Sequence, residues 1–241
     1  ASGFYSSTQN IGEIENKGIE IGLNTVNVKS KDFEWSSNIT FNSNKNKVLK
    51  LATEGSRISN SAYQITQVGS PVSSYYLMNV IGIFQNADEV AKSPIQHPKT
   101  QPGDLKFEDV NLDGKITASD KKVLGSPWPD FSWGFTNKIS YKNFSLSVFV
   151  NGSHGGYNYF LAGETLMNSA GVQNQLAMVD RRWKSEANPG DGTIPRAIRS
   201  TYAYGFSTTS RFLFDASYIR IKNINLSYTL PKNLVSMLSL N

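Results

Sequence analysis

The residues whose types and spacing could do chemistry form one acidic segment of the chain. Side chains with oxygen atoms stand at the first, third and fifth positions of a twelve-residue loop, namely Asp109, Asn111 and Asp113. Gly114 follows at the sixth position, where a calcium-binding loop turns sharply, and Asp120 occupies the twelfth. Hard cations need such clusters, because only a nearly complete set of oxygen ligands replaces their lost hydration. The spacing therefore predicts a structural calcium site in residues 109–120.

The remaining positions of this loop also suit calcium, with one departure. Lys115 would supply its backbone carbonyl, Ile116 would anchor the loop in a core, and Thr117 would act directly or through a water. The departure is Asp120, because an EF-hand has a bidentate Glu at that position, although dockerin-like calcium loops also use Asp there. An acidic turn without metal is the alternative interpretation. A calcium ion here would hold a loop in place and would not activate a substrate.

Catalytic chemistry has no comparable support in the sequence. Cysteine is absent, and the two histidines, His97 and His154, lie in no metal-ligand pattern. We find no arrangement of a nucleophile with a base, and therefore expect no enzyme and no catalytic residues. The net charge is +5, but basic residues are scattered and form no stripe with interleaved aromatics, which argues against a nucleic-acid partner.

The composition is typical of strands and turns. Apolar residues make up 39 % and aromatic residues 12 % of the 241 residues, and Gly, Ser, Asn and Thr are frequent. No stretch approaches the run of about 18 or more apolar residues that a membrane helix needs. A helical membrane protein is thereby excluded. A β-barrel is not, because its lipid face uses only every second residue.

Several segments alternate between apolar and polar residues with a period of two. Residues 33–41, 131–141 and 144–152 are predicted to be strands with one apolar and one polar face. Residues 19–28 and 219–230 also alternate, but each changes phase midway, which predicts a bulge or a bend. Alternation alone does not distinguish a barrel strand facing lipid from a strand in a soluble β-sandwich.

The predicted connections fall into two sizes. Short turns are expected at residues 29–32, at 142–143 and after Pro231, whereas long loops cover residues 43–130 and 153–217. This asymmetry is typical of outer-membrane barrels.

Neither long loop is expected to lack structure throughout. The first is too long for one structureless connection, so we expect at least one further strand near residues 64–85. In the second, residues 176–183 have a helical pattern of one or two turns before residues 188–190 end it.

A cluster of aromatic residues precedes and enters one predicted strand. Trp128, Phe131, Trp133 and Phe135 are either a membrane-interface belt or a stacking platform for sugar rings, with the first three as the candidate contact residues. The belt is favoured, because these residues share a face and lie where a loop enters a strand.

Several segments, in order, resemble the C-terminal half of the SusC/RagA-type TonB-dependent outer-membrane transporters. They include Pro-Gly-Asp-Leu-Lys-Phe-Glu-Asp-Val-Asn-Leu-Asp-Gly-Lys-Ile at residues 102–116 and Gly-Ser-Pro-Trp-Pro at 125–129. Others are Trp-Gly-Phe at 133–135, Phe-Ser-Leu-Ser-Val-Phe at 144–149, and residues 16–20, 68–72, 82–85 and 216–223. The matching segments span nearly the whole chain, so this resemblance is more specific than the calcium pattern alone.

The resemblance implies an all-β fold, in which residues 1–241 form an antiparallel transmembrane segment of a plugged barrel of about 22 strands with long extracellular loops. It implies a place in the bacterial outer membrane, in contact with its lipid. It also implies energy from the TonB complex, through an N-terminal segment expected upstream of this chain, and a SusD-like lipoprotein lid. Substrates of the family are oligosaccharides or peptides.

The same resemblance gives an orientation. We expect the chain to lack both ends of the complete protein. If the short turns are periplasmic, the loop 109–120 lies outside the cell, where calcium would stiffen a loop that contacts the lid or the substrate. The alternative is a secreted, soluble β-sandwich that binds glycans and carries a structural calcium loop.

Overall fold

The computed structural model describes residues 12–167, 169–171, 173–199, 208–231 and 235. The chain divides into two compact units. The sheet unit comprises Glu15–Asn46, Trp128–Gly156 and Ala216–Asn241, and the loop unit comprises Ala1–Ile14, Lys47–Pro127 and Tyr157–Asp215. Within the described ranges, no helix has the length and apolar character needed to cross a membrane.

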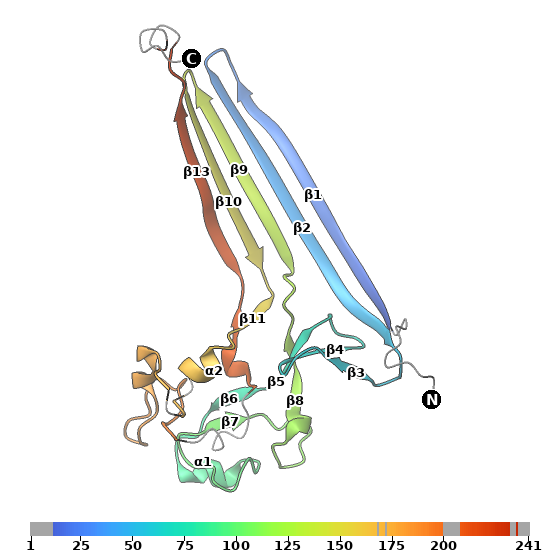
Figure 1. Cartoon of the computed structure of the whole chain (residues 1–241), viewed down its shortest axis with the longest axis vertical. Helices are drawn as coiled ribbons and strands as arrows, with labels where there is room; N and C mark the ends of the chain where they lie inside the picture. The colour runs from blue at the N-terminus through green and yellow to red at the C-terminus, as the bar shows by residue number, and fades with distance from the viewer. Residues whose placement is uncertain (1–11, 168, 172, 200–207, 232–234, 236–241) are drawn as a thin grey trace, which may run out of the picture. The chain divides into compact units, whose positions relative to one another are not determined.

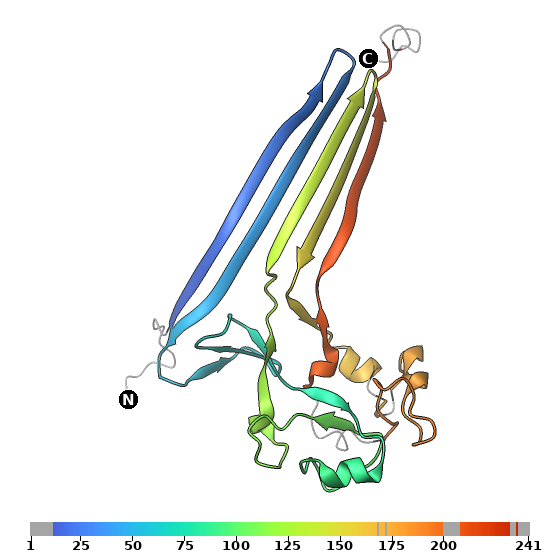
Figure 2. The same cartoon turned by 180° about the vertical axis from the view of Figure 1, so that it is seen from behind.

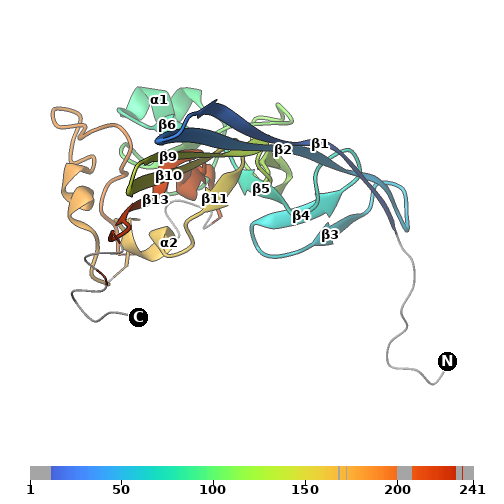
Figure 3. The same cartoon turned by 90° about the horizontal axis from the view of Figure 1, so that it is seen from above.

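The sheet unit is built on one antiparallel sheet of five strands in the order β1-β2-β9-β10-β13. The strands are β1 (Gly12–Lys29), β2 (Phe33–Leu51), β9 (Phe131–Tyr141), β10 (Phe144–His154) and β13 (Tyr218–Tyr228). They run side by side in both side views (Figures 1 and 2), and the view from above shows them as a single layer (Figure 3). The predicted strands at residues 33–41, 131–141 and 144–152 are confirmed. Two of them are longer than expected, because β2 continues to Leu51 and β10 to His154.

The short turns gather at one end of this sheet. Lys142 donates its backbone N–H to the carbonyl of Asp32 over 2.7 Å, and Thr229 donates to Asn143 over 2.8 Å. The turns at residues 30–32 and 142–143 are thus neighbours, as predicted, whereas the turn expected after Pro231 falls on residues outside the described ranges. We call this the turn end of the sheet and the opposite end the loop end.

A bulge in β13 accounts for the phase change predicted in residues 219–230. Ile221 pairs with Val150 and Asn223 pairs with Phe149, so Lys222 is an extra residue with no Cα partner in the ladder to β10. Because one residue is looped out, Ile221 faces the same side of the sheet as the apolar residues that follow it. The bulge therefore keeps the apolar face continuous. In a regular strand of this sequence, the apolar side chains before and after Lys222 would point to opposite faces.

No such slip occurs between Asn16 and Asn24 of β1. Its side chains contact β2 in one constant register, with Asn16 bonded to Asn46 and Asn24 to Asn38. The phase change predicted in residues 19–28 runs from Leu23 to Val26, beyond the span of these pairs, so the bulge or bend expected there stays a prediction.

Register sorts the side chains of β2, β9, β10 and β13 into an apolar and a polar face. The apolar face holds many exposed large side chains: Trp35, Ile39, Ile139, Tyr141, Phe144, Ile219, Ile221, Ile224, Leu226 and Tyr228. The polar face holds Glu34, Ser36, Asn38, Thr40, Asn42, Ser132, Thr136, Lys138, Ser140, Ser145, Ser147, Asn151, Ser153, Asn223, Asn225 and Ser227.

Aromatic residues border the apolar face at both ends. At the turn end the ladder places Phe33, Tyr141, Phe144 and Tyr228 in one row across four strands. Near the loop end, Phe41 pairs with Trp133. The eight residue steps from Phe33 to Phe41 span about 26 Å along the strand at about 3.3 Å per residue. This length matches a membrane-spanning β-strand.

The loop unit contains short strands in three small sheets. One sheet has the order β3-β4-β5-β8, and the others pair β6 with β7 and β11 with β12. These strands are β3 (Arg57–Ser59), β4 (Gln64–Gln67), β5 (Ser74–Met78), β6 (Val80–Ile83), β7 (Leu105–Phe107), β8 (Lys121–Gly125), β11 (Tyr157–Tyr159) and β12 (Leu213–Asp215). The further strand expected near residues 64–85 is confirmed as β4, β5 and β6.

The helices of the loop unit are short. They are α1 (Ala87–Lys92) and α2 (Gly163–Leu166), with 3-10 turns η1 (Ala118–Asp120), η2 (Ala177–Arg181) and η4 (Ser210–Phe212). The helical pattern predicted at residues 176–183 is the 3-10 turn η2, which ends well before residues 188–190.

The two long connections are therefore structured. One core cluster comprises Met78, Ile83, Leu105, Phe107, Ile116 and Ala170, and another comprises Tyr75, Leu77, Tyr159, Met167 and Phe212. Each cluster combines residues from both long connections. The connections pack together because burial of these side chains offsets the entropy lost on ordering so much chain.

Candidate functional site

The first half of the acidic loop is folded as a tight turn around its own oxygen atoms. Asp109 accepts the backbone N–H of Gly114 over 2.8 Å, Asn111 accepts that of Asp113 over 3.1 Å, and Asp113 accepts that of Lys115 over 2.8 Å. Gly114 has a φ of 80°, which is the sharp bend that the sixth loop position requires. The three side chains that the sequence predicts as cation ligands are thus brought together.

The second half of the loop is anchored at Ile116, as the sequence predicts. Ile116 is buried in the core of the loop unit, 5 % exposed, and its backbone N–H donates to the carbonyl of Ile95 over 2.9 Å. Lys115 forms an isolated parallel bridge with Ile95. These contacts fix the second half of the loop against the protein.

Asp120 closes the loop from a buried position. Its Oδ1 accepts the N–H of Val110 over 2.9 Å, and its Oδ2 accepts that of Thr117 over 2.7 Å. Desolvation acts to raise the pKa of Asp120, but these backbone donors stabilise the carboxylate more strongly, so its pKa lies below the usual value. In this arrangement Asp120 completes a capping box with Thr117.

The loop fits a calcium ion in part. Asp109, Asn111 and Asp113 supply the hard oxygen donors that calcium prefers. Asp120 would have to share its oxygens between a cation and the two backbone donors. Over the described ranges, no three His, Cys, Asp or Glu side chains gather in a group that could hold a metal ion, so an ion here would also depend on Asn111 and on backbone carbonyls.

The three aromatic residues predicted as contact residues, out of the cluster of four, have different surroundings. Phe131 stacks on Phe41 with ring centroids 5.7 Å apart. Trp133 lies on the apolar face and covers Gly152, where an added Cβ would come within 2.6 Å of the indole. Trp128 precedes β9, is about half exposed at 49 %, and lines a cavity with asparagine side chains. Phe131 and Trp133 are thus strand residues, and Trp128 is not.

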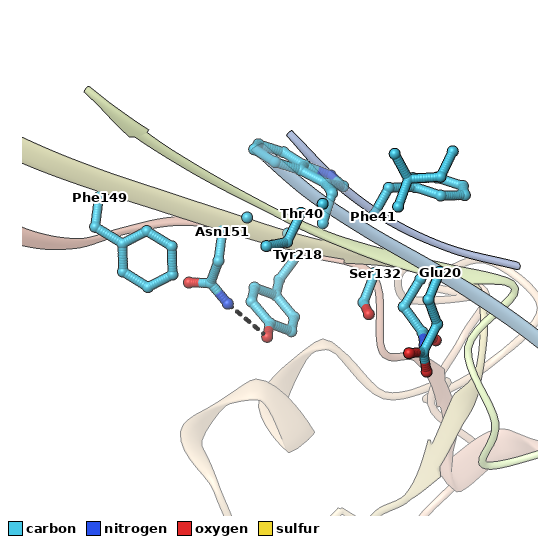
Figure 4. A pocket seen from close by; sticks show the side chains of 13 residues that line it. Glu20, Thr40, Phe41, Ser132, Phe149, Asn151 and Tyr218 are labelled. Atoms are coloured by element: carbon cyan, nitrogen blue, oxygen red, sulfur yellow. Dashed lines mark hydrogen bonds between the residues drawn. The ribbon is translucent and has the colours of Figure 1, made fainter. Parts of the chain in front are cut away.

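A hollow lies on the sheet toward its loop end. Its volume is about 630 Å³. It is lined by Glu20, Ile21, Gly22, Thr40, Phe41, Asn42, Ser132, Trp133, Gly134, Phe149, Asn151, Gly152 and Tyr218. Figure 4 shows Phe149, Asn151, Tyr218, Ser132 and Glu20 projecting to the same side of the sheet, away from Phe41.

Hydrogen bonds hold the polar side chains of this hollow in place. Asn151 donates its Nδ2 to the hydroxyl of Tyr218 over 3.1 Å (Figure 4). Asn42 donates its Nδ2 to Oε1 of Glu20 over 2.8 Å. Gly134 keeps space beneath the Phe149 ring, since an added Cβ would lie 3.2 Å from that ring. The hollow therefore offers an aromatic ring beside fixed amide, hydroxyl and carboxylate groups.

The sequence patterns did not identify Phe149 and Tyr218, the aromatic residues that line the hollow on the polar face. Phe149 and Tyr218 each carry a cation near the ring, with Lys222 Nζ 5.9 Å and Arg220 Cζ 5.1 Å from the respective centroids. One signal was available for Phe149, because it is a large apolar residue at a polar position of its alternating strand. Tyr218 gave no comparable signal, because its face depends on the bulge at Lys222.

Comparison with known proteins identifies what this chain is related to. No protein-family model matches it. TonB-dependent receptor P3 of Formosa agariphila is 35 % identical over 96 % of the chain, and TonB-dependent receptor P26 of the same organism is 34 % identical over 98 %. TonB-dependent receptor SusC of Bacteroides thetaiotaomicron is 28 % identical over 92 % of the chain. The chain is homologous to a segment of the SusC/RagA-type TonB-dependent receptors. It spans about a quarter of their length, 23 %, 24 % and 21 % respectively.

Solved structures agree on the fold. A structure of the RagAB peptide transporter matches 98 % of this chain and 25 % of its own with a TM-score of 0.75 at 23 % identity. The RagAB peptide importer in its 'open-open' state matches 97 % of this chain with the same TM-score. The predicted all-β class is therefore confirmed.

The relatives also indicate the cellular location of the chain. TonB-dependent receptors of the SusC/RagA type are outer-membrane proteins, and the predicted location of this segment in the bacterial outer membrane is confirmed. The relatives are receptors and a transporter and not enzymes, which agrees with the expectation of no catalytic site.

Proposed function

We propose that the complete protein imports oligosaccharides or peptides across the outer membrane. In this proposal the TonB complex supplies energy through a segment outside this chain, and a SusD-like lipoprotein covers the extracellular mouth. The similarity to SusC and to the RagAB peptide transporter supports both the activity and the partners.

The observation that carries the proposal is the two-faced sheet. Its apolar face leaves Ile224 64 % and Leu226 70 % exposed, and a row of aromatic residues borders that face at the turn end. Water does not favour so much exposed apolar surface, whereas lipid does. Aromatic side chains prefer the membrane–water interfaces, which accounts for their rows. The opposite face is polar and suits the water-filled lumen of a barrel.

A barrel of about 22 strands would accommodate this sheet. The outer strands β1 and β13 each have one neighbour in the sheet. Lipid does not tolerate unpaired strand edges, so in the membrane both edges would pair with strands outside this chain. A β-sandwich has less support, because the described strands of the sheet unit form one sheet with no second sheet facing it.

The orientation follows from the unequal ends of the sheet. In outer-membrane barrels the short turns face the periplasm and the long loops face outward. The turn end would then be periplasmic, and the lid, the substrate and the acidic loop would meet outside the cell.

We also propose that the acidic loop binds calcium. Asp109, Asn111 and Asp113 would be its side-chain ligands, with the Lys115 carbonyl and Asp120 completing the set. The turn at Gly114 and the anchoring of Ile116 support this assignment. The ion would keep the loop rigid, since it would hold the Asp109 and Asp113 carboxylates in one coordination shell.

Calcium binding is tested by calorimetry on the complete protein. Asp113→Ala should abolish binding at this site. Asp88→Ala, which changes an exposed carboxylate in α1, should leave binding intact and serves as the matched control. Equal binding by both variants would exclude the loop as the site.

Import is tested in cells that lack the receptor. Reintroduced receptor should restore uptake of labelled oligosaccharides or peptides, and uptake should require both the TonB complex and the lipoprotein partner. Restored uptake in a strain without TonB would contradict the proposal.

A further inference from the structure

A second cavity at the loop end of the sheet unit has an unusual lining. Its volume is about 320 Å³. It is lined by Asn16, Asn42, Asn44, Asn46, Trp128, Pro129 and Phe131. These residues include four primary amides, one proline and two aromatic rings, and none of them is charged at neutral pH.

Strand geometry explains how the amides gather. Asn42, Asn44 and Asn46 alternate along β2, so their side chains point to the same face of the strand. Asn16 joins them from β1, where its Oδ1 accepts the Nδ2 of Asn46 over 2.7 Å. Asn42 is fixed by its bond to Glu20 over 2.8 Å. The amides thus form a row whose positions are set by two paired strands.

The aromatic wall is held beside this row by the chain that leads into β9. The hydroxyl of Ser43 donates to the carbonyl of Asp130 over 2.7 Å and ties this segment to β2. Phe131 stacks on Phe41 and belongs to the apolar face, so the aromatic surface beside the amides is that of Trp128, which is 49 % exposed. The cavity therefore has an accessible flat apolar surface beside a row of polar groups.

We propose that this cavity binds one ring of a neutral oligosaccharide. The apolar C–H face of a sugar ring packs on an aromatic side chain, here Trp128. Each sugar hydroxyl both donates and accepts hydrogen bonds, and a primary amide does the same with two donors and a carbonyl acceptor. The inference rests on the proposed import function and narrows its substrate class from oligosaccharides or peptides to uncharged oligosaccharides.

The lining disfavours the other substrates. An acidic sugar or a peptide terminus would lose hydration on entering the cavity without gaining a counter-charge from the residues that line it. A volume of about 320 Å³ is at the lower end for ligand pockets, which suits one ring of a longer chain.

The test is calorimetric titration of the complete receptor in detergent. The probes are maltohexaose, cellohexaose, laminarihexaose and mannohexaose as neutral sugars, a hexamer of uronic acids, and a mixture of short peptides. We expect at least one neutral hexasaccharide to bind, and Trp128→Ala to weaken it by about tenfold or more, which equals about 1.4 kcal/mol. Trp128→Phe, which keeps a flat ring, should restore most of the affinity.

The amides are tested in the same way. Asn44→Ala should weaken the same sugar several-fold. Asn225→Ala is the matched control, because Asn225 lies on the polar face of β13 outside the cavity, and it should bind as the wild type does. Equal losses in the two variants would contradict a specific role of the cavity.

Three results would overturn the inference. They are no binding of any neutral sugar, binding of a neutral sugar that does not depend on Trp128, and a Trp128-dependent preference for peptides or for the uronic acid hexamer.

Uptake measured with the same variants separates this inference from the import function. Import with sugar binding unaffected by Trp128→Ala would refute the cavity alone. Binding that depends on Trp128 without TonB-dependent import would refute the import function alone.

Discussion

Deletion of Lys222 would test whether a bulge keeps the apolar face of β13 continuous. Ile221 and Asn223 already pair with consecutive residues of β10, so the deletion should leave a regular ladder with Ile221 and Ile224 still on the apolar face. The interaction lost is that of Lys222 with the Phe149 ring, whose centroid lies 5.9 Å from Nζ. An exposed cation–π contact contributes about 0.5–1 kcal/mol. We therefore expect the shortened receptor to assemble with a stability loss of about 1 kcal/mol or less.

Deletion of Ser147 in the regular strand β10 is the matched control. Deletion of one residue moves the side chains on one side of the deletion to the opposite face of the sheet. The side chains that move include either Phe144 and Leu146 or Val148 and Val150. Two large apolar side chains would leave the apolar face in either case. Full burial of each contributes about 1.5–3 kcal/mol, so the loss is roughly 3–6 kcal/mol before any cost of placing polar side chains in lipid.

Assembly of both variants is measured by heat-modified gel mobility and by recovery from the outer-membrane fraction. The bulge deletion should give a folded band close to the wild type, and the control deletion should give little or none. Failure of both variants would refute the register argument. Normal assembly of both would refute the assignment of one face to lipid.

Three further predictions follow from other contacts. Replacing Asn137 by Leu removes the acceptor of the Trp35 indole N–H, bonded over 2.9 Å on the apolar face, and should destabilise the receptor to denaturant by about 1–3 kcal/mol despite the added apolar surface. Asp104 is fully buried, and its carboxylate forms an ion pair with Arg196 over 2.7 Å, which Asp104→Ala would remove. The expected loss in unfolding free energy is about 3 kcal/mol, and the double Ala variant should lose less than the sum of the two single changes. Chelation of calcium should speed protease cleavage within residues 109–120, and calcium but not magnesium should reverse it.

The sequence predicts most of the sheet because strand alternation is a local property. The apolar residues of segment 131–141 all stand at odd positions, and their common face follows from the pleat alone. The bulge was also accessible, since the shift from Ile221 to Ile224 breaks a strict period of two. What a local pattern could not give is which strands are neighbours, since β2 pairs with β9 across the entire first loop region.

The extension of β2 shows where local patterns end. Residues 42–47 read Asn-Ser-Asn-Lys-Asn-Lys and have no apolar member, so the predicted strand ends at Phe41. The strand nevertheless continues, because it keeps β1 as a neighbour and gains side-chain contacts such as Asn46 to Asn16. A polar stretch of this kind forms a strand only when a partner strand supplies its hydrogen bonds.

The candidate sites depend on the same long-range register. The amide row of β2 is visible in the sequence, but its aromatic wall at Trp128 lies far away in the chain and is brought near by the pairing of β2 with β9. Phe149 and Tyr218 likewise meet only through the pairing of β10 with β13. The acidic loop differs, because its ligands are close in sequence, and the structure brings the first three together as predicted.

The hollow at Phe149 and the cavity at Trp128 share a position that bears on function. Each takes its polar groups from the strands themselves, and each lies toward the loop end. Side chains on paired strands are held more rigidly than those on loops, which favours recognition of a ligand with fixed geometry. In the proposed orientation, an incoming substrate meets the loop end first. A neutral sugar that binds beside Trp128 would then pass next to the hollow, where the rings of Phe149 and Tyr218 lie beside fixed polar groups. A second site along the path would allow a bound chain to advance, because a transport path must release what it binds.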